Sequence, residues 1–187
     1  MSISSNASRS LPPADFLTGW GQTASQLLFL ITGASGTGKT SWCLALAKEA
    51  AARGRKVTGL CSPAVFENGR KVGIDLVDLR STARRRMAAL KAPEMGEQRG
   101  ASRDWQFDEQ ALEWGNSLLG PAMHDLFILD ELGPLEFEHG RGLTNAFTVL
   151  DNGRFALACV VVRPSLLLQA QDRWPAARLL DIGGSPA

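Results

Sequence analysis

The sequence has few of the residues that build metal and disulfide sites. Its 187 residues include three cysteines and two histidines. Cys43, Cys61 and Cys159 form no C-x-x-C pair, so we expect reduced, buried thiols rather than a redox motif or a disulfide framework. His124 and His139 have no partners at the spacing of metal ligands, which argues against a zinc site.

Long apolar runs and an excess of one charge are also missing. No apolar run approaches the ~20 residues that a helix needs to span a membrane, and residues 1–16 lack the apolar core of a signal peptide. The 20 basic and 19 acidic residues leave a net charge of +1. Because this balance attracts neither nucleic acid nor a membrane surface, we expect a cytoplasmic protein with no membrane partner, and we disfavour nucleic acid as a partner.

The chain is long enough for one domain with its own core. Residues 1–26 are rich in serine and contain two adjacent prolines, which indicates a mobile N-terminal leader. We expect residues 27–187 to form a single folded domain. The apolar residues through which the leader could pack on that domain are Phe16, Leu17 and Trp20.

Apolar runs that predict strands alternate with segments that predict helices. The expected strands are 27–32, 56–62, 126–131, 155–162 and 179–182. The expected helices are 39–53, 82–91, 107–120, 141–151 and 165–178. Such alternation predicts an α/β fold of three layers, with a mostly parallel sheet covered by helices on both faces. Residues 64–79 add a β-hairpin to this plan, because Asn68-Gly69 between two β-prone runs suits a type I′ turn.

The stretch 33-GASGTGKT-40 fits the pattern G-x-x-x-x-G-K-[ST] at every position, between an expected strand and an expected helix. Glycines let the backbone turn tightly so that N–H groups point at phosphate oxygens, and the helix N-terminus adds a favourable dipole. Lys39 can reach the β- and γ-phosphates, and the Thr40 hydroxyl can bind Mg²⁺. The expected nucleotide-binding residues are Gly33, Ala34, Ser35, Gly36, Thr37, Gly38, Lys39, Thr40 and Ser41.

Two acids end the apolar run 126–129. Asp130 is the expected second partner of Mg²⁺, because ligands bind at the carboxyl edge of an open α/β sheet. Glu131 can orient and deprotonate a water beside the γ-phosphate, which favours hydrolysis over transfer to an acceptor. For each acid the structural alternative is a cap or an exposed residue at the strand end.

Arginines supply further candidates. Arg163 directly follows the expected strand 155–162 and could stabilise charge that develops on the γ-phosphate, although a salt bridge at the rim fits equally well. Arg80 and Arg84–Arg86 form the densest basic cluster, interpreted as a solvated helix face with a phosphate-reaching lid as the alternative. A flexible loop is expected at 91–104. Trp105 could cover a base, whereas most of the five tryptophans are expected to pack.

Three blocks of the sequence resemble the small P-loop nucleoside-triphosphatases that include the thermophilic bacterial enzyme and the human cancer-related nucleoside-triphosphatase. The blocks are 31-ITGASGTGKTS-41, 69-GRKVGIDLVDL-79 and 126-LFILDELGPLEF-137. The first block is generic, and 130-DELGPLE-136 is the most specific. The likeness covers about residues 27–165.

This resemblance implies Mg²⁺-dependent hydrolysis of ATP, GTP and related triphosphates with loose base choice. It also implies a P-loop fold in which a strand, here 155–162, lies between the loop strand and the acidic strand. The residues carried over are Gly33 to Ser41, Asp130 and Glu131, with Glu136 as a weaker candidate. Lys39, Glu131 and Arg163 are the expected catalytic residues, and Thr40 and Asp130 the expected metal ligands. A small-molecule or nucleotide kinase and a nucleotide-dependent binding module remain the alternatives.

Overall fold

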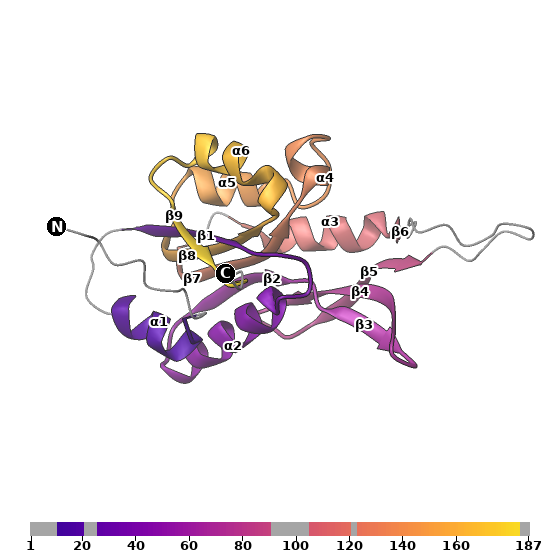
Figure 1. Cartoon of the computed structure of the whole chain (residues 1–187), viewed down its shortest axis with the longest axis horizontal. Coiled ribbons are helices and arrows are strands. Elements are labelled where there is room, and N and C mark those ends of the chain that lie inside the picture. Colours follow the sequence, from indigo (N-terminus) through magenta and orange to yellow (C-terminus); the bar gives the residue numbers. More distant parts are fainter. Residues whose placement is uncertain (1–10, 21–25, 91–104, 121–122, 184–187) are drawn as a thin grey trace, which may run out of the picture.

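The computed structural model describes residues 11–20, 26–90, 105–120 and 123–183 (Figure 1). Nine strands form one sheet in the order β6-β5-β4-β2-β7-β8-β1-β9, with β3 paired to β4. The strands are β1 (Leu27–Thr32), β2 (Val57–Cys61), β3 (Ala64–Glu67), β4 (Arg70–Asp78), β5 (Arg84–Leu90), β6 (Trp105–Phe107), β7 (His124–Leu132), β8 (Phe155–Val162) and β9 (Arg178–Asp181). The helices are α1 (Pro13–Trp20), α2 (Lys39–Ala52), α3 (Glu109–Leu118), α4 (Pro134–Phe137), α5 (Asn145–Asp151), the 3₁₀ turn η1 (Pro164–Leu166) and α6 (Leu167–Arg173).

One half of the sheet is parallel. β2, β7, β8, β1 and β9 all run in the same direction, with Leu126 beside Leu157 and Leu157 beside Leu27 in the central register. β7 and β8 are buried along most of their length because helices cover both of their faces, whereas β9 at the sheet edge is largely exposed. β8 lies between β7 and β1. The predicted α/β class is confirmed, and so is the place of strand 155–162 between the loop strand and the acidic strand.

The other half of the sheet is antiparallel. β3 and β4 form the predicted hairpin, and both turn residues have positive φ, 49° at Asn68 and 75° at Gly69. Positive φ at both central positions is the mark of a type I′ turn, whose twist matches that of the strands. β5 and β6 extend the hairpin into a four-stranded arm that projects from the body of the molecule (Figure 1).

The helix predicted at 82–91 is wrong, because residues 84–90 form strand β5 against β4. The Asp75 carboxylate on β4 draws in two arginines, with Arg86 Nε at 2.6 Å and Arg84 at 3.5 Å. Arg85 points to the other face, where its guanidinium lies 4.9 Å from the ring of Trp114 on α3. Arg84–Arg86 therefore belong to the sheet, whereas Arg80 lies in the turn between β4 and β5. The loop expected at 91–104 lies outside the described residues.

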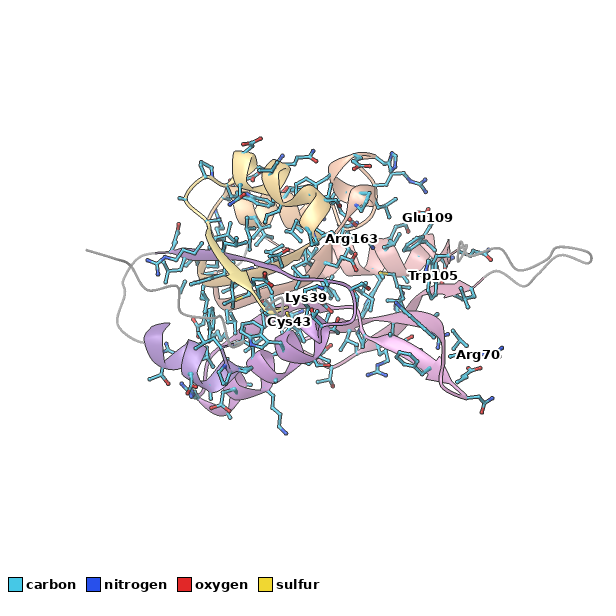
Figure 2. The ribbon with its side chains drawn as sticks, in the orientation of Figure 1. Lys39, Cys43, Arg70, Trp105, Glu109 and Arg163 are labelled. Atoms are coloured by element: carbon cyan, nitrogen blue, oxygen red, sulfur yellow. The ribbon has the colours of Figure 1, made fainter. Side chains whose placement is uncertain are left out.

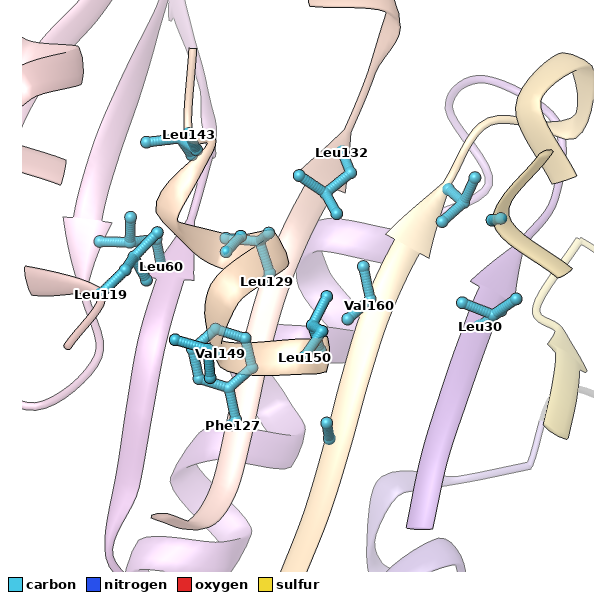
Figure 3. Close-up of a cluster of buried hydrophobic side chains, with 14 of the residues drawn as sticks. Leu30, Leu60, Leu119, Phe127, Leu129, Leu132, Leu143, Val149, Leu150 and Val160 are labelled. Atoms are coloured by element: carbon cyan, nitrogen blue, oxygen red, sulfur yellow. The ribbon is translucent and has the colours of Figure 1, made fainter. Parts of the chain in front are cut away.

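Helices cover the two faces of the parallel half unequally (Figure 1). α1 and α2 pack on one face, where all three cysteines are buried and unpaired. Burial raises the pKa of each of these thiols. α3, α4, α5 and α6 cover the other face. Figure 3 shows the apolar cluster there, in which Phe127 and Leu129 of β7 meet Val149 and Leu150 of α5.

The segment before β1 packs on the domain through apolar residues, as expected from the sequence. Phe16 and Leu17 of α1 are buried, and the Phe16 ring lies edge-on to Phe29 at 4.9 Å and to Trp42 at 5.3 Å. The indole N–H of Trp42 donates to the carbonyl of Leu11 at 2.8 Å. The side chain of Trp20 lies outside the described residues, and the division into 1–26 and 27–187 stays a prediction.

The ends of several elements differ from their predicted positions. Phe107 belongs to β6 rather than to α3, because the Asp108 carboxylate caps α3 by accepting from the N–H groups of Gln110 and Ala111. α5 begins at Asn145, and α6 ends at Arg173. No helix in the described ranges is long and apolar enough to cross a membrane.

Candidate active site

The glycine-rich loop joins the carboxyl end of β1 to the first turn of α2. Gly36 and Gly38 have φ of 81° and 88°, which side chains rarely adopt. At Gly33 (φ 140°) space is limiting as well, because a Cβ there would lie 2.9 Å from the backbone nitrogen of Gly183. The segment after β9 thus lies directly against the loop. Ile182 N donates to Thr32 O at 3.0 Å and fixes this contact.

Lys39 crosses the mouth of the loop. Its Nζ donates to the carbonyl oxygens of Gly33 at 2.8 Å and Ala34 at 2.6 Å. The Thr37 hydroxyl donates to the same Ala34 oxygen at 3.0 Å. These bonds hold the ammonium group over the turn, where a phosphate chain cradled by the loop would meet it. Figure 2 labels Lys39 at this position near the centre of the molecule.

Asp130 and Thr40 meet between β7 and α2. Asp130 is buried, the Thr40 hydroxyl is hydrogen-bonded to its carboxylate, and the N–H of Ser62 donates to Oδ2 at 3.1 Å. Burial raises the pKa of Asp130, and the bonds from Thr40 and Ser62 oppose that rise. A hydroxyl and a carboxylate on adjacent elements are oxygen donors of the kind that Mg²⁺ accepts alongside phosphate oxygens. This pair therefore fits the predicted metal site.

The described residues hold no cluster of three or more His, Cys, Asp or Glu side chains that could bind a metal by themselves. A metal at Thr40 and Asp130 would need further ligands from water and phosphate. That requirement suits Mg²⁺, which keeps several waters and is commonly held by one or two carboxylates together with substrate phosphates.

Glu131 has an unusual backbone. Its φ is 92°, one of three positive values at non-glycine residues in the described chain. It lies in a β-bulge of β7, because Leu129 pairs with Val160 but Leu132 pairs with Val162. Bulges re-aim side chains and are frequent beside active sites. The bulge turns the Glu131 carboxylate toward the carboxyl end of β8, where it forms an ion pair with Arg163.

Glu136 has a structural position. It is buried, and its two carboxylate oxygens accept from Gly133 N and Leu143 N, each at 2.9 Å. Burial raises the pKa of Glu136, and these two bonds oppose the rise. The side chain thus closes the turn after β7 and ties it to the segment before α5. Sequence reasoning noted Glu136 without finding these partners.

The structure brings most predicted site residues to one edge of the sheet, since parallel strands end together there. The loop follows β1, Asp130 and Glu131 end β7, and Arg163 follows β8. Sequence reasoning missed Gly183. For Arg163 it left open a salt bridge at the rim, and the structure shows one, with Glu131 as the partner that the sequence did not name. Trp105 lies on β6 in the arm, where Lys71 Nζ is 5.1 Å from its ring centre, and its predicted role at a base stays untested.

Comparison with known proteins agrees with this geometry. The model of a family described as NTPase matches residues 28–182. The chain belongs to this NTPase family. Among relatives, the nucleoside-triphosphatase THEP1 of Thermofilum pendens is 30% identical over 137 residues, covering 73% of this chain and 75% of the relative. THEP1 of Caldivirga maquilingensis is 28% identical over 130 residues, covering 68% of this chain and 70% of the relative.

Solved structures show the same NTPase fold. The solution structure of a human cancer-related nucleoside triphosphatase superposes with a TM-score of 0.62 at 20% identity, over 84% of this chain and 88% of that one. The crystal structure of THEP1 from the hyperthermophile Aquifex aeolicus gives a TM-score of 0.58 at 17% identity, over 83% and 89%. At these identities the likeness concerns the fold alone, and the roles of individual residues must be argued from this chain.

Proposed function

We propose that this NTPase hydrolyses ATP, GTP and other nucleoside triphosphates to diphosphate and phosphate in a Mg²⁺-dependent reaction. The observation that carries the proposal is the meeting, at one sheet edge, of a phosphate-binding loop with Asp130 and Glu131. Membership of the NTPase family implies a nucleotide substrate, and in this proposal the loop binds its phosphates. The proposed contacts come from the backbone and side chains of residues 33–41.

Each side chain has a distinct proposed role. Lys39 neutralises the β- and γ-phosphates, and Thr40 and Asp130 hold the metal, which when bound polarises the phosphate oxygens. Glu131 orients the attacking water and accepts its proton. Arg163 stabilises negative charge on the γ-phosphate in the transition state. The partly exposed position of Glu131 supports its role because solvent water can reach the carboxylate.

Phosphate release tests this function. Purified protein is incubated with Mg²⁺ and ATP, GTP, CTP or a deoxynucleotide, without any acceptor. We expect release from several of them, and Glu131→Gln should lower the rate by about 10²- to 10⁴-fold. The matched control is Glu138→Gln, because Glu138 is exposed beyond the site and should leave the rate unchanged.

The two alternative functions give different outcomes in the same assay. Phosphate transfer only after an acceptor is supplied, with little hydrolysis alone, would support a kinase. Tight nucleotide binding with negligible turnover would support a nucleotide-dependent binding module. Equal rates for the wild type and Glu131→Gln would remove Glu131 from the mechanism.

A further inference from the structure

Glu131 and Arg163 form an ion pair beside the phosphate loop. Glu131 lies in the bulge at the end of β7, and Arg163 follows β8, the neighbouring strand. Arg163 Nε donates to Glu131 Oε1, and the side chains are 58% and 40% exposed. Figure 2 labels Arg163 near the centre of the molecule, above Lys39. Both groups therefore lie at the solvent-open rim of the site rather than in the core.

This pairing conflicts with the proposed roles of both residues. A guanidinium that donates to Glu131 is not free to bond a γ-phosphate with the same N–H group. A carboxylate oxygen turned toward Arg163 is not turned toward a water in line with that phosphate. Opening of the pair would free both the Nε–H of Arg163 and the Oε1 of Glu131 for these roles.

We propose that Arg163 senses the γ-phosphate and releases Glu131 only when a triphosphate is bound. The guanidinium exchanges the Glu131 carboxylate for the oxygens of the terminal phosphate, and the freed carboxylate then takes up the water. A diphosphate in the loop lacks the γ-phosphate that would replace Glu131 as the partner of Arg163, so the ion pair stays closed. This inference rests on the proposed hydrolysis and adds a basis for distinguishing triphosphate from diphosphate.

Three features of the pair favour such an exchange. An ion pair at this exposure contributes little stability, so it is easily broken. A terminal phosphate offers more charge and several acceptor oxygens in a geometry that a guanidinium matches. The Glu131 side chain is partly exposed, so rotation about its side-chain bonds lets the carboxylate change partner without a shift of β7.

Equilibrium binding tests the exchange separately from catalysis. The dissociation constants of a non-hydrolysable ATP analogue and of ADP are measured with Mg²⁺, and their ratio gives the preference for triphosphate. We expect Arg163→Ala to lower this preference roughly tenfold or more, with ADP affinity within about twofold of the wild type. Arg163→Lys should recover part of the preference because it keeps the charge but loses the planar fork.

Glu131→Gln should act in the opposite direction. With the amide in place no ion pair has to break, so the preference for triphosphate should rise by about threefold or more above that of the wild type. The matched control is Arg141→Ala. Arg141 forms a comparable exposed ion pair with Glu109 away from the loop, and its loss should leave both dissociation constants unchanged.

The outcomes separate this inference from the proposed function. If Arg163→Ala weakens ADP and the analogue equally, or changes neither, Arg163 is only a structural partner of Glu131 and the inference is overturned. A preference in Glu131→Gln at or below that of the wild type overturns it as well. If the wild type neither binds nor hydrolyses nucleotide, the proposed function fails first. If the wild type hydrolyses nucleotide but Arg163→Ala has the same ratio of ADP to analogue dissociation constants as the wild type, the proposed function stands and only the exchange is overturned.

Discussion

At the residue scale, the positive φ of Glu131 is the most unusual backbone feature of the candidate site outside its glycines. A positive φ at a residue with a side chain costs of order 1–3 kcal/mol and persists only where the surroundings impose it. Here the surroundings are a bulge between paired strands and a turn closed by Glu136. The bulge places the carboxylate at the rim of the site. In a regular strand, the alternation of side chains would instead point it toward a face of the sheet.

This strain predicts that, among variants of residue 131 without the carboxylate, the one that tolerates positive φ is the more stable. Glu131→Ala and Glu131→Gly both remove the carboxylate and its ion pair, and both should abolish most hydrolysis. Glycine tolerates φ of 92° whereas alanine does not, so the glycine variant should have the larger free energy of unfolding, by about 1 kcal/mol. Urea denaturation of the two variants measures this difference.

The control uses the same two substitutions at Glu138, where φ is −102°. At an ordinary φ glycine only adds freedom to the unfolded chain, so Glu138→Gly should be less stable than Glu138→Ala. If the order of stability at position 131 is the same as at 138, the backbone of Glu131 is not strained.

At the element scale, the glycine-rich loop is held in place by its contact with the segment after β9. Gly183 N donates to Asp181 Oδ1 at 2.7 Å, which turns the chain toward the loop. A Cβ on Gly183 would meet Ala34 N at 3.1 Å and Thr37 Cγ2 at 3.2 Å. Both neighbours belong to the loop, so added bulk at this position must shift either the loop or the segment after β9 by a few tenths of an ångström.

We therefore predict that Gly183→Ala weakens nucleotide binding, by about tenfold, because loop N–H groups shifted by a few tenths of an ångström no longer match the phosphates. Titration with a fluorescent nucleotide measures the affinity. Gly120→Ala is the control, since a Cβ there meets nothing within 4 Å. Unchanged affinity in Gly183→Ala would show that the segment after β9 can yield without affecting the loop.

Elements with strong local signals were predicted from the sequence almost to the residue. β1 and β8 are short, buried and apolar, and the Asn68-Gly69 turn dictates its hairpin. β5 was missed because its arginines favour a helix locally. Pairing with β4 and the bonds to Asp75 override that preference, and neither is visible in the segment itself.

The candidate site was predictable in part for the same reason. The loop and the two acids of β7 form contiguous patterns whose residue types suit the proposed chemistry. The ion pair of Glu131 with Arg163 joins residues 32 positions apart, and it depends on strand order and a bulge. Such features arise from packing, so local patterns could name the residues but not their contacts.

At the scale of the whole molecule, the sheet combines a buried parallel half with an antiparallel arm. The parallel half brings the loop, Asp130 and Glu131 to one edge, and the arm begins at that same edge because β3 follows the carboxyl end of β2. The candidate site at this edge is built on β1, α2 and β7. β1 and β7 contribute to both apolar clusters, and α2 contributes to one of them. Nucleotide should therefore stabilise the folded domain as a unit.

We predict a Mg²⁺-dependent rise in melting temperature with ADP. A ligand at 100 times its dissociation constant stabilises the folded state by about 2.7 kcal/mol, which for a chain of this size corresponds to a rise of about 5–10 °C. Thr40→Ala should lose the part of the shift that depends on Mg²⁺ and keep the part seen with ADP and a chelator. Thermal unfolding followed by circular dichroism measures each shift.

The control is Thr148→Ala. Thr148 is an exposed threonine on α5, and this variant should behave as the wild type. A shift of equal size with and without Mg²⁺ in the wild type would mean that Thr40 and Asp130 hold no metal in the nucleotide complex.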